Sequence, residues 1–301
     1  MTSTHSSDNG TLDLKRHAAC LIILYHPQTE VVEQLVSSYV NRFAHAIFID
    51  NSPEPNPTWI EKINRVEGTQ IHYKANHENK GIGFALNQGF KLASELGATW
   101  VLTMDQDSWF ETDDFFKALE KETINTNIAI YGAGIHKPPP FFNAYNNTWW
   151  KVLVQITSGN LVRVNAWKSI EGFRENWFID EIDHDFCLRL KSQNWMILCT
   201  RFVCMKHALG TATKCRWLLT NKSVEIALHS PERTYYIIRN AWFIVLKYAR
   251  SEPFFALNRI KMMLIKFALI LMLYPNKWRY CRFWCIGLLD GLMRNTRRKL
   301  L

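Results

Sequence analysis

Short apolar segments rich in branched side chains alternate with segments of helical periodicity in the first third of the chain. Residues 18–24 read AACLIIL, and the proline that follows at position 27 is not tolerated in a central strand. Alternation of strand and helix is typical of a parallel sheet with helices on both faces, so we predict an α/β fold. The predicted strands are 18–24, 46–49, 71–74 and 100–104, and the predicted helices include 32–40 and 83–96.

Polar side chains stand where three of these predicted strands end. Tyr25-His26 follows the first strand, Asp50-Asn51 the second, and Asp105-Gln106-Asp107 the fourth. In open parallel sheets, ligands bind in the crevice outside the carboxyl ends of the strands. We therefore expect these three groups to border one ligand-binding crevice.

The carboxylates of Asp105 and Asp107 are one residue apart at the end of a buried strand. Residues two apart on extended backbone point the same way, so the two charges would repel unless a cation lies beside them. Mg²⁺ and Mn²⁺ take oxygen ligands and commonly share phosphate oxygens with a substrate. The pattern predicts a metal–diphosphate site. The alternative is that Asp107-Ser108 caps a helix containing 113–119.

The stretch 79–89 reads NKGIGFALNQG and opens the predicted helix with small residues. Gly81, Gly83 and Ala85 would let a ligand approach the backbone, and amides at a helix N-terminus favour phosphate. Tight packing of the helix on the sheet explains the same residues equally well. The spacing is not that of the dinucleotide-binding fingerprint.

A surplus of basic residues suggests an anionic partner. The 301 residues include 36 Lys and Arg against 27 Asp and Glu, a formal charge of +9. Nucleic acid, anionic lipid and a phosphorylated substrate are the candidates, and a merely soluble basic surface is the alternative. The carboxylates at these strand ends disfavour nucleic acid, because without a metal they would repel phosphate. The seven cysteines are odd in number and lack a short spacing framework, which favours a reducing compartment over a disulfide scaffold, and no Cys-x-x-Cys pair suggests a zinc site.

The two ends of the chain differ in character from its middle. Residues 1–16 are polar, lack an apolar signal region and are expected to form a flexible tail, followed by a domain over 17–232. Residues 233–301 interleave aromatic, apolar and basic side chains. Lys261 and Lys266 interrupt the longest apolar run, which suits an amphipathic helix at a membrane surface better than a span. A packing face for a second copy of the chain and a helical lid are the alternatives.

The ordered set of motifs resembles inverting family 2 glycosyltransferases of the nucleotide-diphospho-sugar-binding (GT-A-like) fold, over roughly residues 18–250. Within that family it most resembles bacterial rhamnosyltransferases, which use dTDP-L-rhamnose to build O-antigen and related polysaccharides. The residues that carry the resemblance are YHP at 25–27, DNS at 50–52, the stretch 79–89, DQD at 105–107, TSGN at 157–160, EGF at 171–173, FIDEIDHDFCLRL at 178–190, KHALG at 206–210 and RTYYIIRN at 233–240.

The resemblance implies roles for the strand-end residues. Asp50 would accept a hydrogen bond from the pyrimidine N–H, and Asp105 and Asp107 would hold Mg²⁺ or Mn²⁺ on the diphosphate, with His207 as a third ligand. The implied donor-binding residues are Tyr25, His26, Asp50, Asn51, Asn79, Gly81, Gly83, Asn87, Asp105, Gln106 and Asp107.

The resemblance also implies a catalytic base. Asp183 aligns with the catalytic aspartate, Asp180 is the reserve candidate, and Asp185 aligns with an acidic position that is structural or near the acceptor. Capping of a helix that starts near Asp183 is the alternative for one or two of these acids. Ser158 and Gly159 would line the acceptor side, where Trp149 and Trp150 could stack on a sugar ring. Paired tryptophans are equally often part of a core.

The expected function is metal-dependent, inverting transfer of L-rhamnose to a lipid-linked saccharide at the cytoplasmic face of the bacterial inner membrane. Anionic lipid at that surface would attract the basic C-terminal segment. A UDP-sugar donor (galactofuranose, glucose or an N-acetyl sugar) and a non-catalytic scaffold are the alternatives. A homo-oligomer is a further candidate assembly.

Overall fold

The computed structural model describes residues 12–56, 60, 66–122, 125–135, 143–207, 212–216, 223–298 and 300. The chain divides into two compact units. The first unit comprises Met1–Lys80, Phe84–Phe173 and Phe186–His207, and the second comprises Gly81–Gly83, Arg174–Asp185 and Ala208–Leu301.

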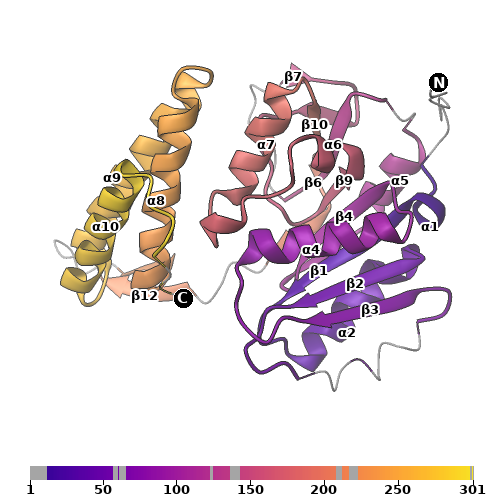
Figure 1. The fold of residues 1–301 in the computed structure, drawn as a ribbon, viewed down its shortest axis with the longest axis horizontal. Helices are drawn as coiled ribbons and strands as arrows, with labels where there is room; N and C mark the ends of the chain where they lie inside the picture. Colours follow the sequence, from indigo (N-terminus) through magenta and orange to yellow (C-terminus); the bar gives the residue numbers. More distant parts are fainter. Residues whose placement is uncertain are drawn as a thin grey trace. The chain divides into compact units, whose positions relative to one another are not determined.

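The first unit is built on a nine-stranded sheet within the described residues, with the order β3-β2-β1-β4-β9-β6-β10-β8-β7 (Figure 1). Neighbours β3, β2, β1 and β4 are parallel, as are β6 and β10, whereas β9 runs antiparallel between β4 and β6. The strands are β1 (Ala18–Leu24), β2 (His45–Asp50), β3 (Gln70–Ala75), β4 (Trp100–Asp105), β6 (Ile128–Gly134), β7 (Asn143–Ala144), β8 (Trp149–Lys151), β9 (Asn160–Arg163) and β10 (Met196–Val203). This confirms the predicted mostly parallel α/β sheet.

Helices cover both faces of this sheet. Side chains of Cys20, Ile22 and Leu24 on β1 join the core cluster that contains α2, whereas Leu21 faces Gly89 of α4 on the opposite side. Every second residue of a strand points to the same face, so burial of nearly all of β1 requires cover on both sides. In the described residues, the helices of this unit are α1 (Leu14–His17), α2 (Thr29–Tyr39), η1 (Val40–Arg42), α5 (Asp114–Glu120) and α6 (Val164–Ser169), and α4 (Ile82–Glu95) and α7 (Ile182–Ser192) continue into it.

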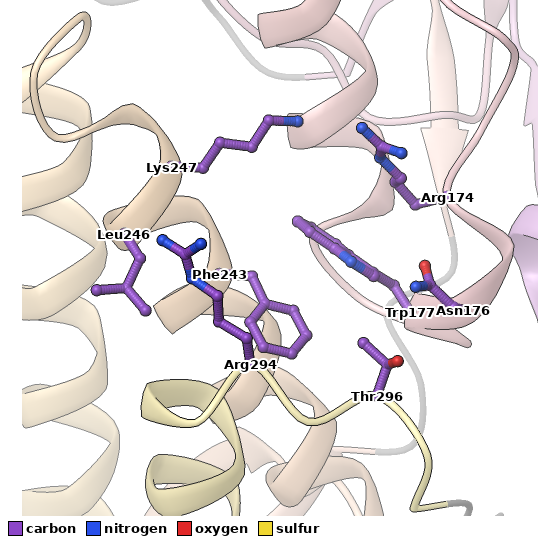
Figure 2. Close-up of a pocket in the computed structure, with 8 residues that line it drawn as sticks. All are labelled: Arg174, Asn176, Trp177, Phe243, Leu246, Lys247, Arg294 and Thr296. Atoms are coloured by element: carbon purple, nitrogen blue, oxygen red, sulfur yellow. The ribbon is translucent and has the colours of Figure 1, made fainter.

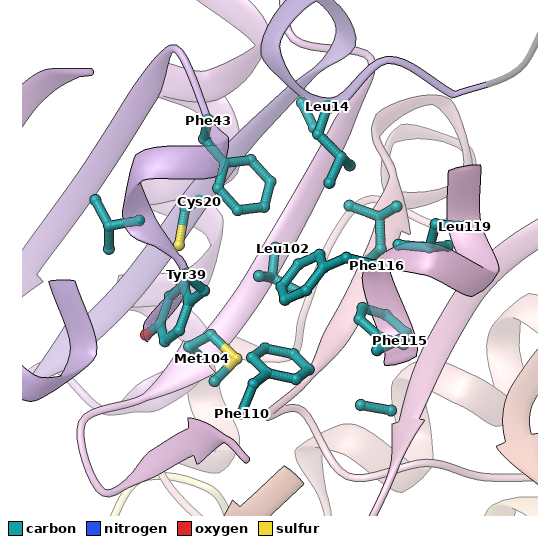
Figure 3. Close-up of a cluster of buried hydrophobic side chains, with 14 of the residues drawn as sticks. Leu14, Cys20, Tyr39, Phe43, Leu102, Met104, Phe110, Phe115, Phe116 and Leu119 are labelled. Atoms are coloured by element: carbon teal, nitrogen blue, oxygen red, sulfur yellow. The ribbon is translucent and has the colours of Figure 1, made fainter. Parts of the chain in front are cut away.

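An aromatic cluster fills the core on the α2 side (Figure 3). Phe110 lies on the short strand β5 (Ser108–Phe110), and its ring stacks on that of Phe115, with centroids 5.4 Å apart. Tyr39 packs edge-on against Phe110 at 5.8 Å. Strand β5 pairs with β11 (Met205–His207) in a separate two-stranded sheet. The core therefore supports the segment that directly follows Asp107.

Part of the predicted N-terminal tail is folded. Asp13 caps α1, since its carboxylate accepts a hydrogen bond from the Arg16 amide, and Leu12 and Leu14 are buried in the core. The expectation of a flexible tail is therefore wrong for residues 12–16, because two apolar side chains anchor them. Residues 1–11 lie outside the described residues. The predicted boundary between 17–232 and 233–301 stays a prediction.

The second unit contains three long helices, α8 (Pro231–Tyr248), α9 (Pro253–Leu273) and α10 (Lys277–Leu292). Gly287 and Gly291 of α10 let it approach α8 closely, because a Cβ at either position would lie within 2.7 Å of α8 atoms. A buried hydrogen bond of 2.8 Å from the Tyr235 hydroxyl to Asp290 also joins the two helices. The unit further contains η3 (Glu175–Trp177) and the paired strands β12 (Ala212–Arg216) and β13 (Ser223–Ala227).

Candidate active site

The ends of β2, β1 and β4 lie level at one edge of the sheet in the first unit. The strand register places Asp50 beside Leu24 and Asp105 beside Ile23. The His26 amide donates a hydrogen bond of 2.7 Å to Ser52 Oγ, which links the residues after β1 to those after β2. The structure therefore brings the three predicted strand-end groups to one edge.

Gln106 ties the residue after β1 to the residues after β4. Its side-chain carbonyl accepts a 2.8 Å hydrogen bond from the Tyr25 amide, and its side-chain amide donates a 3.0 Å bond to the Tyr25 carbonyl. This reciprocal pair holds the backbone between Asp105 and Asp107 against the end of β1. The Tyr25 side chain remains 46% exposed.

Asp50 is fully buried at the end of β2. One carboxylate oxygen accepts the Ser52 amide at 2.8 Å, and the other accepts the Tyr73 hydroxyl at 2.9 Å. Burial, reinforced by Asp50, raises the pKa of Tyr73, so this hydroxyl stays protonated and donates. Each carboxylate oxygen has capacity for a further bond, which is compatible with the predicted contact to a pyrimidine N–H. Asn51 is held alongside by Asn76, whose side-chain amide donates to it at 2.8 Å.

Asp105 and Asp107 are half-buried; Asp105 is the last residue of β4, and Asp107 follows two residues later. The Asp105 amide donates a 3.0 Å bond to Ser158 Oγ, so the predicted acceptor-side serine lies beside the predicted metal ligand. Gly159 adopts a φ of +77°, and a Cβ there would lie 2.6 Å from Met205 Sδ. Glycine is therefore required at this position by backbone conformation and by close packing.

The helix-capping alternative for Asp107 and Ser108 is wrong. Ser108 begins strand β5, whereas helix α5 begins at Asp114 and its N-cap residue is Asp113. The paired strand β11 places the backbone of His207 opposite Ser108. Asp105, Asp107 and His207 therefore belong to one small region of the first unit, although the His207 side chain lies outside the described side chains.

The residues at this edge suit a hard divalent cation. Two carboxylates combined with substrate phosphate oxygens form an ordinary Mg²⁺ environment, and Mn²⁺ accepts the same donors. Among the described side chains, no group of three or more His, Cys, Asp and Glu forms a ready-made metal cluster. The donor set therefore fits a metal that is shared with a diphosphate.

The structure explains the small residues of the 79–89 stretch by packing. A Cβ at Gly81 would lie 2.7 Å from the Phe178 carbonyl oxygen, and one at Gly83 would lie 2.5 Å from that of Arg174. Gly81 also has a φ of +86°. Donor binding by the half-buried Asn79 and by these two glycines stays a prediction.

Asn87 and Trp149 both form hydrogen bonds within the protein. The Asn87 side chain donates to the Phe173 carbonyl at 2.9 Å and accepts from the Phe173 amide at 2.8 Å, so it fixes this loop. Trp149 is fully buried, and its indole N–H donates to Glu122 at 2.8 Å. Sugar stacking by Trp149 is wrong, because its ring is fully buried. Donor contact by the half-buried Asn87 stays a prediction. Trp150 is half-buried, with Arg201 4.7 Å from its ring centre.

Three of the four acids at 180–185, in the second unit, have basic partners. Asp180 pairs with Arg233 at 3.0 Å, and Glu181 contacts Arg259 at 3.1 Å. Asp185 is fully buried and accepts from Lys247 at 2.9 Å. The burial and ion pair of Asp185 support a structural role for this residue.

Asp183 differs from these three acids. Its side chain is 22% exposed in the first turn of α7, and no Lys or Arg pairs with it among the described residues. Its carboxylate accepts the His184 amide at 2.8 Å. Asp183 is therefore the acid of this segment whose oxygens remain most available to an external hydroxyl.

Burial and charge set the protonation of the neighbouring groups. Burial raises the pKa of Asp180, and Arg233 only partly offsets this. Burial would also raise the pKa of Glu181, but His184 and Arg259 outweigh it and the pKa is lowered. Burial alone would lower the pKa of His184, but the carboxylates of Asp183 and Glu181 raise it above its ordinary value.

Known sequences and structures resemble this chain over most of its length. The sequence model of Glycosyl transferase family 2 matches residues 20–191, more than half of the chain. The chain belongs to glycosyl transferase family 2. It is therefore a glycosyltransferase, as the motifs predicted. The match includes the strand-end residues and the acidic segment that precedes and opens α7.

One relative of this glycosyltransferase is the dTDP-rhamnosyl transferase RfbF of Shigella flexneri. The two are 26% identical over 289 residues, which cover 90% of this chain and 94% of RfbF. This confirms the resemblance to bacterial rhamnosyltransferases.

Two solved glycosyltransferases share the fold at low identity. The mannosyltransferase PcManGT from Pyrobaculum calidifontis, in complex with GDP-Man and Mn²⁺, is 10% identical with a TM-score of 0.54, over 97% of this chain and 91% of that one. TarS 1–349 of S. aureus, in complex with UDP-GlcNAc, is 14% identical with a TM-score of 0.56, over 92% and 81%. Both confirm the GT-A-like fold.

Two polar residues of α8, Arg239 and Asn240, form a clamp that was not among the predicted site residues. Asn240 donates to the carbonyls of Trp177, Ile179 and Asp180, and Arg239 donates to that of Trp177. Both side chains are fully buried. They hold a segment in which Phe178, Asp180 and Glu181 adopt positive φ. Backbone with positive φ at non-glycine residues is unfavourable in free energy unless the surrounding structure fixes it. The clamp therefore stabilises the segment that precedes Asp183. Adjacent Arg and Asn in an otherwise amphipathic helix were the available signal.

Proposed function

We propose that this glycosyltransferase transfers L-rhamnose from dTDP-L-rhamnose to a hydroxyl of a lipid-linked glycan, with inversion, in bacterial O-antigen or polysaccharide synthesis. The observation that carries this proposal is the similarity to a dTDP-rhamnosyl transferase over 90% of the chain. The strand-end geometry and the available carboxylate of Asp183 support the same chemistry.

Asp50, Asp105 and Asp107 bind the donor in this proposal. Asp50 accepts the thymine N–H, in line with its buried and oriented carboxylate. Asp105 and Asp107, with His207, hold Mg²⁺ or Mn²⁺. When bound, the cation neutralises the charge that develops on the leaving diphosphate. Gln106 keeps the backbone between the two carboxylates in place through its bonds to Tyr25.

Asp183 acts as the base. It takes the proton of the acceptor hydroxyl as the oxygen attacks the anomeric carbon, and the carbon–oxygen bond to the diphosphate breaks on the opposite face. Basic partners restrain Asp180, Glu181 and Asp185, whereas Asp183 has none among the described Lys and Arg side chains. His184 carries positive charge below its raised pKa, and its Nδ1 lies 4.0 Å from the Asp183 carboxylate.

The second unit attaches the enzyme to the cytoplasmic surface of the inner membrane. Leu257, Leu264 and Leu271 recur every seven residues on α9 and are exposed, Leu257 by 62% and Leu264 by 60%. Such a stripe lies on one side of a helix. No helix in the described part of the chain is long and apolar enough to cross a bilayer. From residue 251 onward the acids are Glu252 and Asp290 alone, among many Lys and Arg, which suits an anionic lipid surface.

A UDP-sugar donor is the second candidate. A carboxylate such as Asp50 accepts the N–H of uracil and of thymine alike, so this contact does not separate the two nucleotides.

The test is a transfer assay with the purified full-length enzyme and a lipid-linked acceptor. Each of dTDP-L-rhamnose, UDP-galactofuranose, UDP-glucose and UDP-N-acetylglucosamine is offered with Mn²⁺ or Mg²⁺, and the glycosidic linkage is determined by NMR. The proposal predicts an inverted rhamnosyl product, and chelator abolishes it. Transfer from a UDP-sugar but not from dTDP-L-rhamnose would show that the proposed donor is wrong. Retention of configuration at the anomeric carbon would contradict the inverting mechanism.

A further inference from the structure

A basic pocket lies within the second unit (Figure 2). Its volume is about 270 Å³, and it is bordered by η3, α8 and the residues after α10. Trp177, Phe243 and Leu246 supply an apolar wall, and Asn176 and Thr296 supply polar groups. The cations that line it are Arg174, Lys247 and Arg294.

The pocket carries unbalanced positive charge. Arg174 and Lys247 share one buried carboxylate, that of Asp185, at 3.4 and 2.9 Å. Arg294 is exposed and forms no ion pair with any acid that the structure describes. One negative charge therefore faces three positive charges, which makes the pocket suited to an anion.

The turn that presents Arg294 is held by specific bonds. Arg294 has a φ of 54°, in the left-handed region that non-glycine residues rarely adopt. Just after it, the Asn295 amide donates to the Asp290 carbonyl at 2.8 Å, and its side chain donates to the Asp290 carboxylate at 3.0 Å. Arg298 pairs with the same carboxylate at 2.9 Å. The backbone that carries the Arg294 guanidinium is therefore a turn fixed by hydrogen bonds.

The apolar wall of the pocket indicates which chemical group is attached to the anion. The rings of Trp177 and Phe243 lie 5.4 Å apart, and both are largely buried, so they offer ring surface from a rigid base. Phosphate esters combine strong acceptor oxygens with an organic group, and arginine forks match those oxygens. A phosphate or diphosphate attached to an apolar or sugar group fits both parts of the pocket.

The pocket is linked to the segment that carries the proposed base. Asp185, the shared partner of Arg174 and Lys247, is two residues beyond Asp183 in α7. We infer that the pocket binds the diphosphate that joins lipid to glycan in the acceptor. This inference rests on the proposed function for its ligand. A phospholipid headgroup presents the same phosphate chemistry, and the experiment separates the two sources.

The experiment measures binding by isothermal titration in the presence of chelator, which removes metal-dependent binding at Asp105 and Asp107. Geranyl diphosphate and inorganic pyrophosphate are titrated into the wild type, Arg294→Ala and Arg294→Lys. Arg282→Ala is the matched control, because Arg282 is an exposed arginine of α10 outside the pocket. Loss of a charge-assisted hydrogen bond predicts geranyl diphosphate binding about tenfold weaker in Arg294→Ala, partly restored in Arg294→Lys and unchanged in Arg282→Ala.

Transfer kinetics and binding to lipid vesicles are measured with the same variants. In Arg294→Ala, the KM for lipid-linked acceptor is expected to rise about tenfold while that for the donor stays the same. Equal diphosphate binding by wild type and Arg294→Ala would overturn the inference. The inference would also be overturned if Arg294→Ala lost binding to phosphatidylglycerol vesicles but bound geranyl diphosphate as the wild type does. That result would assign the pocket to a phospholipid headgroup. Arg294-dependent diphosphate binding without sugar transfer would contradict the proposed function and leave the anion pocket standing.

Discussion

Asp183, the proposed base, differs from its acidic neighbours in what surrounds it. Asp180, Glu181 and Asp185 are engaged by Arg233, Arg259 and Lys247. These three acids are largely buried, and removing any of them would take away a charged partner of Arg233, Lys247 or Arg259, which costs stability as well as activity. Asp183, which is partly exposed, can be neutralised with less structural consequence.

Asp183→Asn is expected to lower kcat by about 10²–10⁴-fold, the usual contribution of a general base. Donor affinity should be unchanged, since the donor contacts proposed for the first unit are intact. Single-turnover transfer and donor titration measure the two effects, with Glu95→Gln on the exposed end of α4 as control. Near wild-type turnover would move the base to Asp180 or elsewhere.

His184 makes stability depend on pH. Its pKa is raised in the folded state, where Nδ1 lies 2.7 Å from Glu181 and near Asp183, while Arg259 opposes the shift. The stabilisation is therefore fully present below the unfolded pKa, about 6.5, and is lost as pH rises through the folded pKa.

The difference in Tm between wild type and His184→Gln should accordingly be larger at about pH 6 than at about pH 9. Thermal melts across this range measure it. A difference that grows with pH would show that the carboxylates do not stabilise the charged imidazole.

At the scale of elements, α4 is placed by glycines that admit no side chain. The Arg174 carbonyl lies 2.5 Å from the position of a Cβ on Gly83, and backbone cannot move aside as a flexible side chain can. Gly83→Ala should destabilise the fold by about 1–3 kcal/mol, although alanine is the better helix former.

Thermal melting without donor measures this effect, with Lys91→Ala at an exposed position of α4 as control. An unchanged Tm with weakened donor binding would instead assign Gly83 to the ligand, as the sequence alone equally allowed.

Elements with a local signal were predictable, and those defined by distant partners were not. The strand predicted at 18–24 is β1, and those at 46–49 and 100–104 are β2 and β4 extended by one or two residues. Their apolar runs and polar ends lie within a few residues. The antiparallel insertion of β9 between β4 and β6 depends on pairings that no local pattern encodes.

The same distinction applies within the site. Asp50 and Asp105 were predictable because a strand end is a local feature. Asn87 and Trp149 were assigned to ligands, and their partners Phe173 and Glu122 are distant in sequence. Only the folded chain shows that their polar atoms form hydrogen bonds within the protein.

At the scale of the whole molecule, the proposed membrane attachment rests on the basic and apolar surface of the second unit. Leu257→Glu/Leu264→Glu should weaken binding to phosphatidylglycerol vesicles by at least about tenfold, since burial of each leucine contributes about 1.5–3 kcal/mol. Both positions are exposed, so folding should persist.

Cosedimentation measures this binding, and Asn258→Glu, at an exposed polar position of α9, is the control for added charge. Unchanged cosedimentation of the double variant would exclude this face as the attachment surface.

We propose that the strand ends form a metal-dependent site for dTDP-L-rhamnose. The most direct test titrates dTDP-L-rhamnose and UDP-sugars into purified wild type and Asp105→Ala, with Mn²⁺ and with chelator. We predict that wild type prefers dTDP-L-rhamnose, that chelator abolishes this binding and that Asp105→Ala loses its response to Mn²⁺. Equal binding of dTDP-L-rhamnose with Mn²⁺ and with chelator, in both proteins, would contradict the account.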